Sequence, residues 1–112
     1  MPQIYAENLK TVVVSHSTSG NNEIIPAPTS GYIAIDHINF VPTTAVSVTL
    51  KSGSTAISGV YPLDAKQPLT LENAMHNEKG VITCGRNEAF NINLGSAVLI
   101  SGFIRYRIIG NQ

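Results

Sequence analysis

The sequence predicts an all-β protein, an antiparallel β-sandwich of about eight strands with a jelly-roll-like arrangement. Short apolar runs, most of them alternating with polar residues, recur from one end of the 112 residues to the other. Clusters of Gly, Pro, Asn and Ser separate these runs, and no segment has a convincing long helical pattern. A chain of this length predicts a single domain, residues 1–112.

The first two strands are expected in TVVVSH, residues 11–16, and in NNEIIPAP, residues 21–28. A turn rich in Ser, Gly and Asn separates them. Because proline cannot donate to a strand ladder, Pro26 marks an edge position or the end of the second strand. Residues 1–11 precede the first clear strand pattern, and we interpret them as a candidate N-terminal arm.

The third strand is expected in GYIAIDHINFVP, which contains a change of phase. Ile33 and Ile35 alternate correctly, but the apolar positions resume at Ile38 and Phe40, one residue out of step. One extra residue in a strand restores the inward face at the cost of a local break in the ladder. The sequence therefore predicts a β-bulge at residues 36–37.

AVSVTLK shows clean alternation, with Val46, Val48 and Leu50 on one face, and the turn SGST connects it to AISGVYPL. This pattern predicts a β-hairpin. The segment that follows, residues 64–80, has two interpretations. A two-turn helix running to Gly80 is one, but we favour a short strand around Leu69 followed by a loop.

VITC and EAFNINLG lead into a long closing strand between Ala97 and Ile109. Successive side chains of a strand point to opposite faces, so this strand has two distinct faces. We expect one face to close the core of the domain; it carries Val98, Ile100, Ile104, Tyr106 and Ile108. The opposite face combines apolar and basic residues, namely Leu99, Phe103, Arg105, Arg107 and Ile109.

That second face is the main candidate for an interface with another subunit. Arginine can bury its stem and pair with a carboxylate across a contact, and interfaces are enriched in aromatic residues and arginine. The alternative is that the face packs on the other sheet of the same domain, with the arginines at its rim. The sequence leaves both interpretations open.

Composition argues against binding driven by charge. Charged residues make up 12% of the chain and the formal net charge is +0, so we expect neither nucleic acid nor a membrane as a partner. The N-terminal residues lack the pattern of a signal peptide, and no apolar run reaches the length of a membrane span. With a single cysteine, synthesis in the cytoplasm is the expectation.

The sequence offers no convincing catalytic, cofactor or metal site, and we predict that the protein is not an enzyme. His16, His37 and His76 lie in separate segments without the spacing of metal ligands. Asp36 beside His37 could form an orienting pair, but their place at the expected bulge favours a structural role. Cys84 ends an apolar run and is expected to be a small buried residue.

Residues 46–107, which include VSVTLKSGSTAISGVYPLD and EAFNINLGSAVLISGFIRYR, resemble small virion proteins of tailed bacteriophages, of the capsid decoration or head-fibre type. In these proteins a hairpin with a Ser/Gly turn precedes two closing strands, here Thr49 to Gly59 and Glu88 to Arg107. One departure is that Val81 to Arg86 stands where the family has an aromatic residue before a turn. The loop of residues 72–80 is therefore left without a counterpart.

The resemblance implies a homotrimeric β-sandwich that attaches to the virion. The leading hypothesis is a capsid decoration, or cement, protein at the capsid surface, which stabilises the shell by bridging subunits of the major capsid protein. The alternative is a receptor- or carbohydrate-binding module of a phage fibre or tail. In that case loops 17–23 and 72–80 would carry the ligand site.

Overall fold

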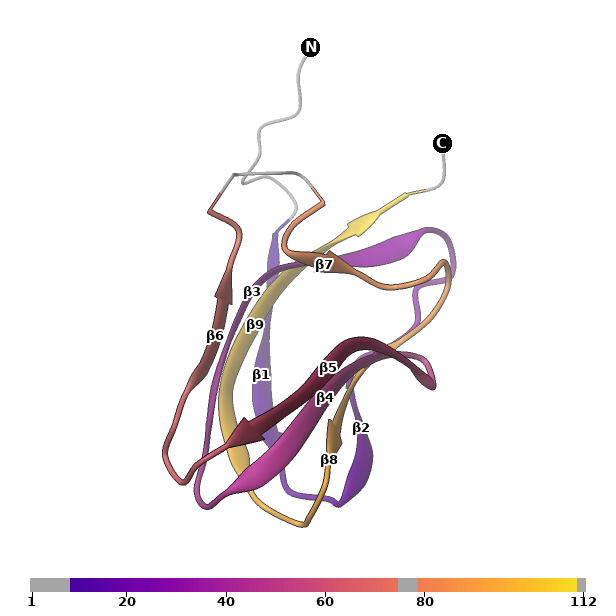
Figure 1. The fold of residues 1–112 in the computed structure, drawn as a ribbon. Helices are drawn as coiled ribbons and strands as arrows, with labels where there is room; N and C mark the ends of the chain where they lie inside the picture. Colours follow the sequence, from indigo (N-terminus) through magenta and orange to yellow (C-terminus); the bar gives the residue numbers. More distant parts are fainter. Residues whose placement is uncertain (1–8, 75–78, 111–112) are drawn as a thin grey trace.

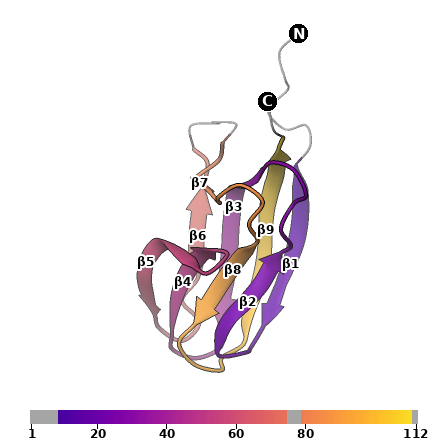
Figure 2. The same ribbon diagram turned by 90° about the vertical axis from the view of Figure 1, so that its right-hand side faces the viewer.

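The computed structural model describes residues 9–74 and 79–110 (Figures 1 and 2). These residues form nine strands and no helix, arranged as two antiparallel sheets that pack against each other. The all-β sandwich predicted from the sequence is therefore confirmed.

Sheet A has the order β1-β9-β3-β6, and a two-residue strand, β7, also pairs with β3. Its strands are β1 (Lys10–His16), β9 (Ile100–Ile109), β3 (Tyr32–Pro42), β6 (Leu69–Glu72) and β7 (Ile82–Thr83). Sheet B has the order β2-β8-β4-β5. Its strands are β2 (Gly20–Ile25), β8 (Phe90–Leu94), β4 (Val46–Ser52) and β5 (Thr55–Leu63).

The strands pair as a series of nested hairpins, which is the pairing pattern of a jelly roll. The tight hairpin of β4 and β5 is innermost, and β3 with β6, β2 with β8 and β1 with β9 enclose it in turn. Successive pairs alternate between the two sheets, and the pairings of β9 with β3 and β8 with β4 complete them. The described residues form nine strands where about eight were expected, and the shortest, β7, contains two residues of the VITC segment.

The core lies between the sheets and is built from the inward positions of the alternating strands. Its centre is at most 1% exposed and consists of large apolar side chains. They include Ile33, Ile35, Ile38, Phe40, Val48, Leu50, Phe90, Ile92, Ile100 and Ile104. The partly buried Val98, Tyr106 and Ile108 pack against this core, so the inward face predicted for the closing strand is confirmed.

The predicted bulge is present in β3. Ile35 lies opposite Tyr106 of β9, whereas His37 lies opposite Arg105, so Asp36 is the extra residue. The Asp36 carboxylate accepts a hydrogen bond from the side-chain amide of Asn73 at 3.0 Å. The bulge shifts the phase of β3, which allows residues on both sides of it to face the core.

The segment after the hairpin forms the short strand β6, as predicted, and its described part contains no helix. The rest of the loop includes His76, which lies outside the described residues. The candidate N-terminal arm falls mainly on residues 1–8, which also lie outside them. Lys10 and Thr11, assigned to that arm from the sequence, instead belong to β1.

Gly102 provides a test of strand packing in sheet A. It lies opposite Phe40, and a Cβ atom there would overlap the Asn39 carbonyl oxygen and lie 2.5 Å from the Phe40 Cα. We expect Gly102→Ala to lower the free energy of unfolding by about 1–3 kcal/mol, measured by urea unfolding followed by circular dichroism. Gly59→Ala on β5 is the matched control, because nothing lies within 4 Å of its Cβ position. Equal stability of the two variants would contradict this account.

Candidate functional site

The outer face of sheet A brings together side chains from three strands. Antiparallel register places residues of β1, β9 and β3 in two adjacent rows. Side chains directly opposite each other in a sheet share a face and lie close enough to interact. One row is Val13, Phe103 and Asn39, and the next is Thr11, Arg105 and His37.

Within these rows, His37, Phe103 and Arg105 form a contact group that we call the aromatic–arginine cluster. The His37 and Phe103 rings stack, with centroids 5.4 Å apart and planes inclined by 4°. The Arg105 Cζ atom lies 5.7 Å from the Phe103 ring centroid, a cation–π geometry. Phe103 is half-buried and Arg105 is exposed, so the cluster presents an aromatic ring and a guanidinium on an open sheet face.

Val13 extends the apolar surface beside the cluster. It lies opposite Phe103 on the neighbouring strand β1 and is 72% exposed, the highest value among the exposed large hydrophobic residues described. Neither Val13 nor His37 was among the residues predicted for an interface. The sequence does indicate that Val13 faces outward, because it alternates in phase with the polar residues Thr11 and Ser15.

The five residues predicted for an interface fall into different environments. Phe103 and Arg105 lie together in the cluster. Leu99 precedes β9, is 39% exposed, and its carbonyl accepts a hydrogen bond from the Thr43 amide at 3.0 Å. Ile109 is half-buried near the other end of β9.

Arg107 is the exception, because it is only 6% exposed. It lies opposite Ala34 of β3, which pairs on its other side with Thr83 of β7 and is 1% exposed. This end of the outer face is therefore covered by the chain itself. Arg107 is not available to a second molecule in this arrangement, and the interface prediction now applies to the exposed members of the set.

A buried polar group surrounds Ser52 at the end of β4. The Ser52 hydroxyl accepts a hydrogen bond from the Gly85 amide at 2.7 Å and donates one to Glu88 Oε1 at 2.5 Å. Ser52 is 2% exposed, so these bonds satisfy a polar group that water cannot reach. They connect the hairpin of β4 and β5 to the loop before β8.

Cys84 lies in the same region and is 6% exposed. Burial raises the pKa of its thiol to about 11; a hydrogen bond with Ser52 opposes the rise and the negative charge of Glu88 adds to it. The thiolate is the reactive form of cysteine, so a thiol with this pKa stays protonated and unreactive near neutral pH. The prediction of a small buried residue is confirmed.

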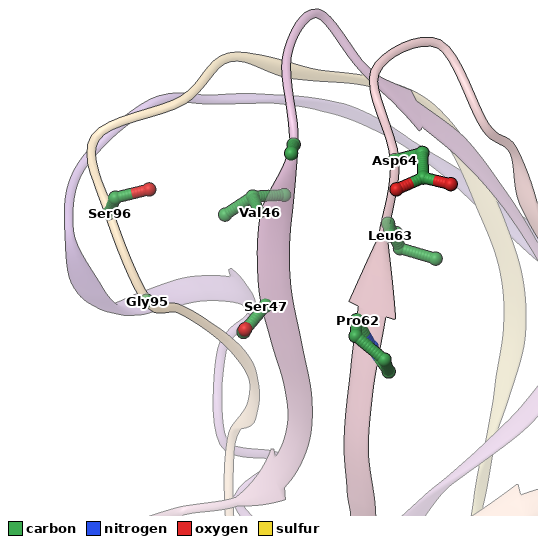
Figure 3. A pocket seen from close by; sticks show the side chains of 8 residues that line it. Val46, Ser47, Pro62, Leu63, Asp64, Gly95 and Ser96 are labelled. Atoms are coloured by element: carbon green, nitrogen blue, oxygen red, sulfur yellow. The ribbon is translucent and has the colours of Figure 1, made fainter.

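Two surface depressions lie elsewhere on the sandwich. The larger, about 360 Å³, lies where β4 begins and β5 ends; Figure 3 shows Val46 and Ser47 between Ser96 on one side and Pro62 to Asp64 on the other. The smaller, about 230 Å³, is lined by residues 29–31 with Arg86 and Asn87. The first contains one carboxylate and the second one guanidinium, so neither supplies the paired acid and base of general catalysis.

Neither depression coincides with the loops expected for a ligand site. In the first of those loops Asn22 is 6% exposed, and its side-chain amide donates to the Thr18 carbonyl at 2.8 Å. The second loop, 72–80, is only partly described. Asn22 therefore stabilises the turn into β2 rather than facing outward.

The described residues contain no group of three or more His, Cys, Asp or Glu side chains that could hold a metal ion. Within the same residues there is also no helix long and apolar enough to cross a membrane. Comparisons with protein-family models, curated proteins and solved structures found no match for this chain.

The pKa of Cys84 predicts a specific dependence of stability on pH. Because folding raises the pKa from 9.0 to about 11, the thiol stabilises the folded state fully below pH 9, and this contribution is lost as the pH rises toward 11. We expect the difference in unfolding free energy between the native protein and Cys84→Ala to shrink between pH 8 and 10.5, as measured by urea unfolding. The variant provides the baseline for all other titrating groups, and a constant difference would contradict this assignment.

Proposed function

We propose that this chain is a structural protein of a tailed-phage virion, a decoration protein that binds the major capsid protein at the capsid surface and catalyses no reaction. The aromatic–arginine cluster, beside the exposed Val13 on an open sheet face, is the observation that supports a binding role most directly. The resemblance of residues 46–107 to small virion proteins supports the choice of partner.

The geometry of the cluster suits protein recognition. Stacking on His37 restrains the Phe103 ring, so less side-chain freedom is lost when a partner covers it. Arg105 offers a guanidinium that a partner carboxylate can meet through two parallel hydrogen bonds. Since the chain has no net charge, affinity depends on this local contact rather than on long-range attraction.

The proposed action is mechanical. A protein that binds the assembled shell and not its dissociated subunits stabilises the shell by mass action. Each attached copy adds buried area between neighbouring capsid subunits. These added contacts must be broken before the subunits can separate and the shell can open. Self-association, as the homotrimer that the resemblance implies, would increase the number of subunits that one assembly bridges.

The test uses expanded, undecorated shells assembled from the major capsid protein of the phage that encodes this chain. We expect the purified protein to co-sediment with these shells and to raise their melting temperature. Phe103→Ala and Arg105→Glu should each weaken binding at least about tenfold, the scale of an interface hot spot. Val60→Ala is the matched surface control, because Val60 is 63% exposed on β5 of the opposite sheet.

Binding by both cluster variants at the affinity of the native protein would exclude the cluster as the attachment site. A glycan array with defined hits, together with no shell binding, would instead support the receptor-binding alternative. Absence of both kinds of binding would contradict the virion proposal.

A further inference from the structure

The two sheets of the described residues have four edges, and the strands at three of them carry features that prevent pairing with another chain. One of these edges is shared by β6 and the two-residue β7, which both pair with β3. Short length, bulges, charge and proline all protect an edge. β6 has four residues. β2 has a register shift between Glu23 and Ile25 and is followed by Pro26, and β5 contains Pro62 and lies opposite a register shift between Thr49 and Lys51.

The fourth edge, β1, is less protected, since its one Lys or Arg residue is Lys10 at its first position. Its seven residues, KTVVVSH, pair with β9 without a register shift and include neither proline nor an acidic residue. In sheet A, β9 lies on one side of β1 and no described strand lies on the other. Figure 2 shows β1 along the border of the molecule. A regular edge of this kind presents unpaired backbone donors and acceptors to another strand.

We propose that a second copy of this chain occupies this edge, pairing antiparallel along β1 about a two-fold axis at Val13. The strand is self-complementary about that residue: Thr11 would lie opposite Ser15 of the second copy, and Val12 opposite Val14. Pairs of β-branched residues and pairs of hydroxyl residues are favourable across antiparallel strands. A two-fold contact requires this self-complementarity, because the same surface serves both partners.

The pairing also explains the exposure of Val13. Residues directly opposite each other share a face, so the two Val13 side chains would meet on the joined outer face. Phe103 lies opposite Val13 within each copy, which gives an apolar row of Phe103, Val13, Val13 and Phe103 across the dimer. The valine, 72% exposed in the single chain, would thereby lose part of its contact with water.

The charges of the two copies do not oppose this contact, but its small area limits the affinity. The chain has no net charge, and Lys10, the charged residue of β1, would lie at the end of the joined edge beside His16 of the second copy. Seven residues span about 24 Å, a strip smaller than the roughly 1,600 Å² of a standard interface. We therefore expect micromolar affinity. This inference does not depend on the virion role, and its symmetry differs from the trimer that the resemblance implies.

The first experiment measures the mass of the full-length chain by sedimentation equilibrium, up to about 1 mM, where micromolar association is saturated. We expect a dimer for the native protein and at least about tenfold weaker association for Val13→Lys, which places two ammonium groups at the two-fold axis. Val60→Lys, the same substitution at a similarly exposed valine of β5, should leave the dimer unchanged.

The second experiment tests the register by disulfide formation under mild oxidation. Opposed residues of antiparallel strands have Cα atoms about 4.5–5.5 Å apart, within the range of a disulfide. Val13→Cys should therefore form a covalent dimer in high yield. Thr11→Cys should not, because the two copies of residue 11 would be four residues apart along the joined strands, about 13 Å. Cys84 is buried, and Val60→Cys serves as the control for random collision.

A native chain that stays monomeric at 1 mM, or a trimer that Val13→Lys leaves intact, would overturn the proposal. Equal crosslinking through residues 11 and 13 would exclude the two-fold at Val13. A chain that dimerises only after removal of residues 1–8 would assign the edge to that segment, and would also overturn the proposal.

Discussion

β9 occupies the middle of sheet A, and its pairing with β1 on one side and β3 on the other joins three distant parts of the chain. Ile104 shows what this achieves, since it lies opposite Val12 of β1 and Ile38 of β3 and is fully buried. The core face of sheet A and the cluster on its outer face both use side chains of this one strand. Displacing β9 would expose the core and would separate Phe103 from His37 at the same time.

The bulge at Asp36 couples these two faces. A regular strand alternates without interruption, so Ile33 and Ile35 could not share a face with Ile38 and Phe40 unless one residue were added. That added residue returns Ile38 to the core and directs His37 outward, opposite Arg105 and within stacking distance of Phe103. A local irregularity required by the core therefore also builds the surface cluster.

Sequence patterns predicted the inward face of the strands well, because burial on one side imposes a strict period of two. The phase change in GYIAIDHINFVP located the bulge for the same reason. The burial of Arg107 could not be predicted in this way, since alternation assigns a residue to a face but does not reveal whether that part of the face is covered. The stacking of His37 on Phe103 could not be predicted either, because it depends on the register between strands that are far apart in the sequence. The two residues of β7 are too few to show a periodic pattern.

The central position of β9 has a consequence for biosynthesis. Residues 100–109 leave the ribosome after every other strand, yet sheet A lacks its middle strand until they arrive. The strands already made would therefore expose apolar side chains and open edges for several seconds, at about 5–20 residues per second. Non-local pairing of this kind also folds slowly once all the strands are available. Newly made copies are thus most vulnerable to aggregation before β9 emerges, and chaperone contact would be most useful at that stage.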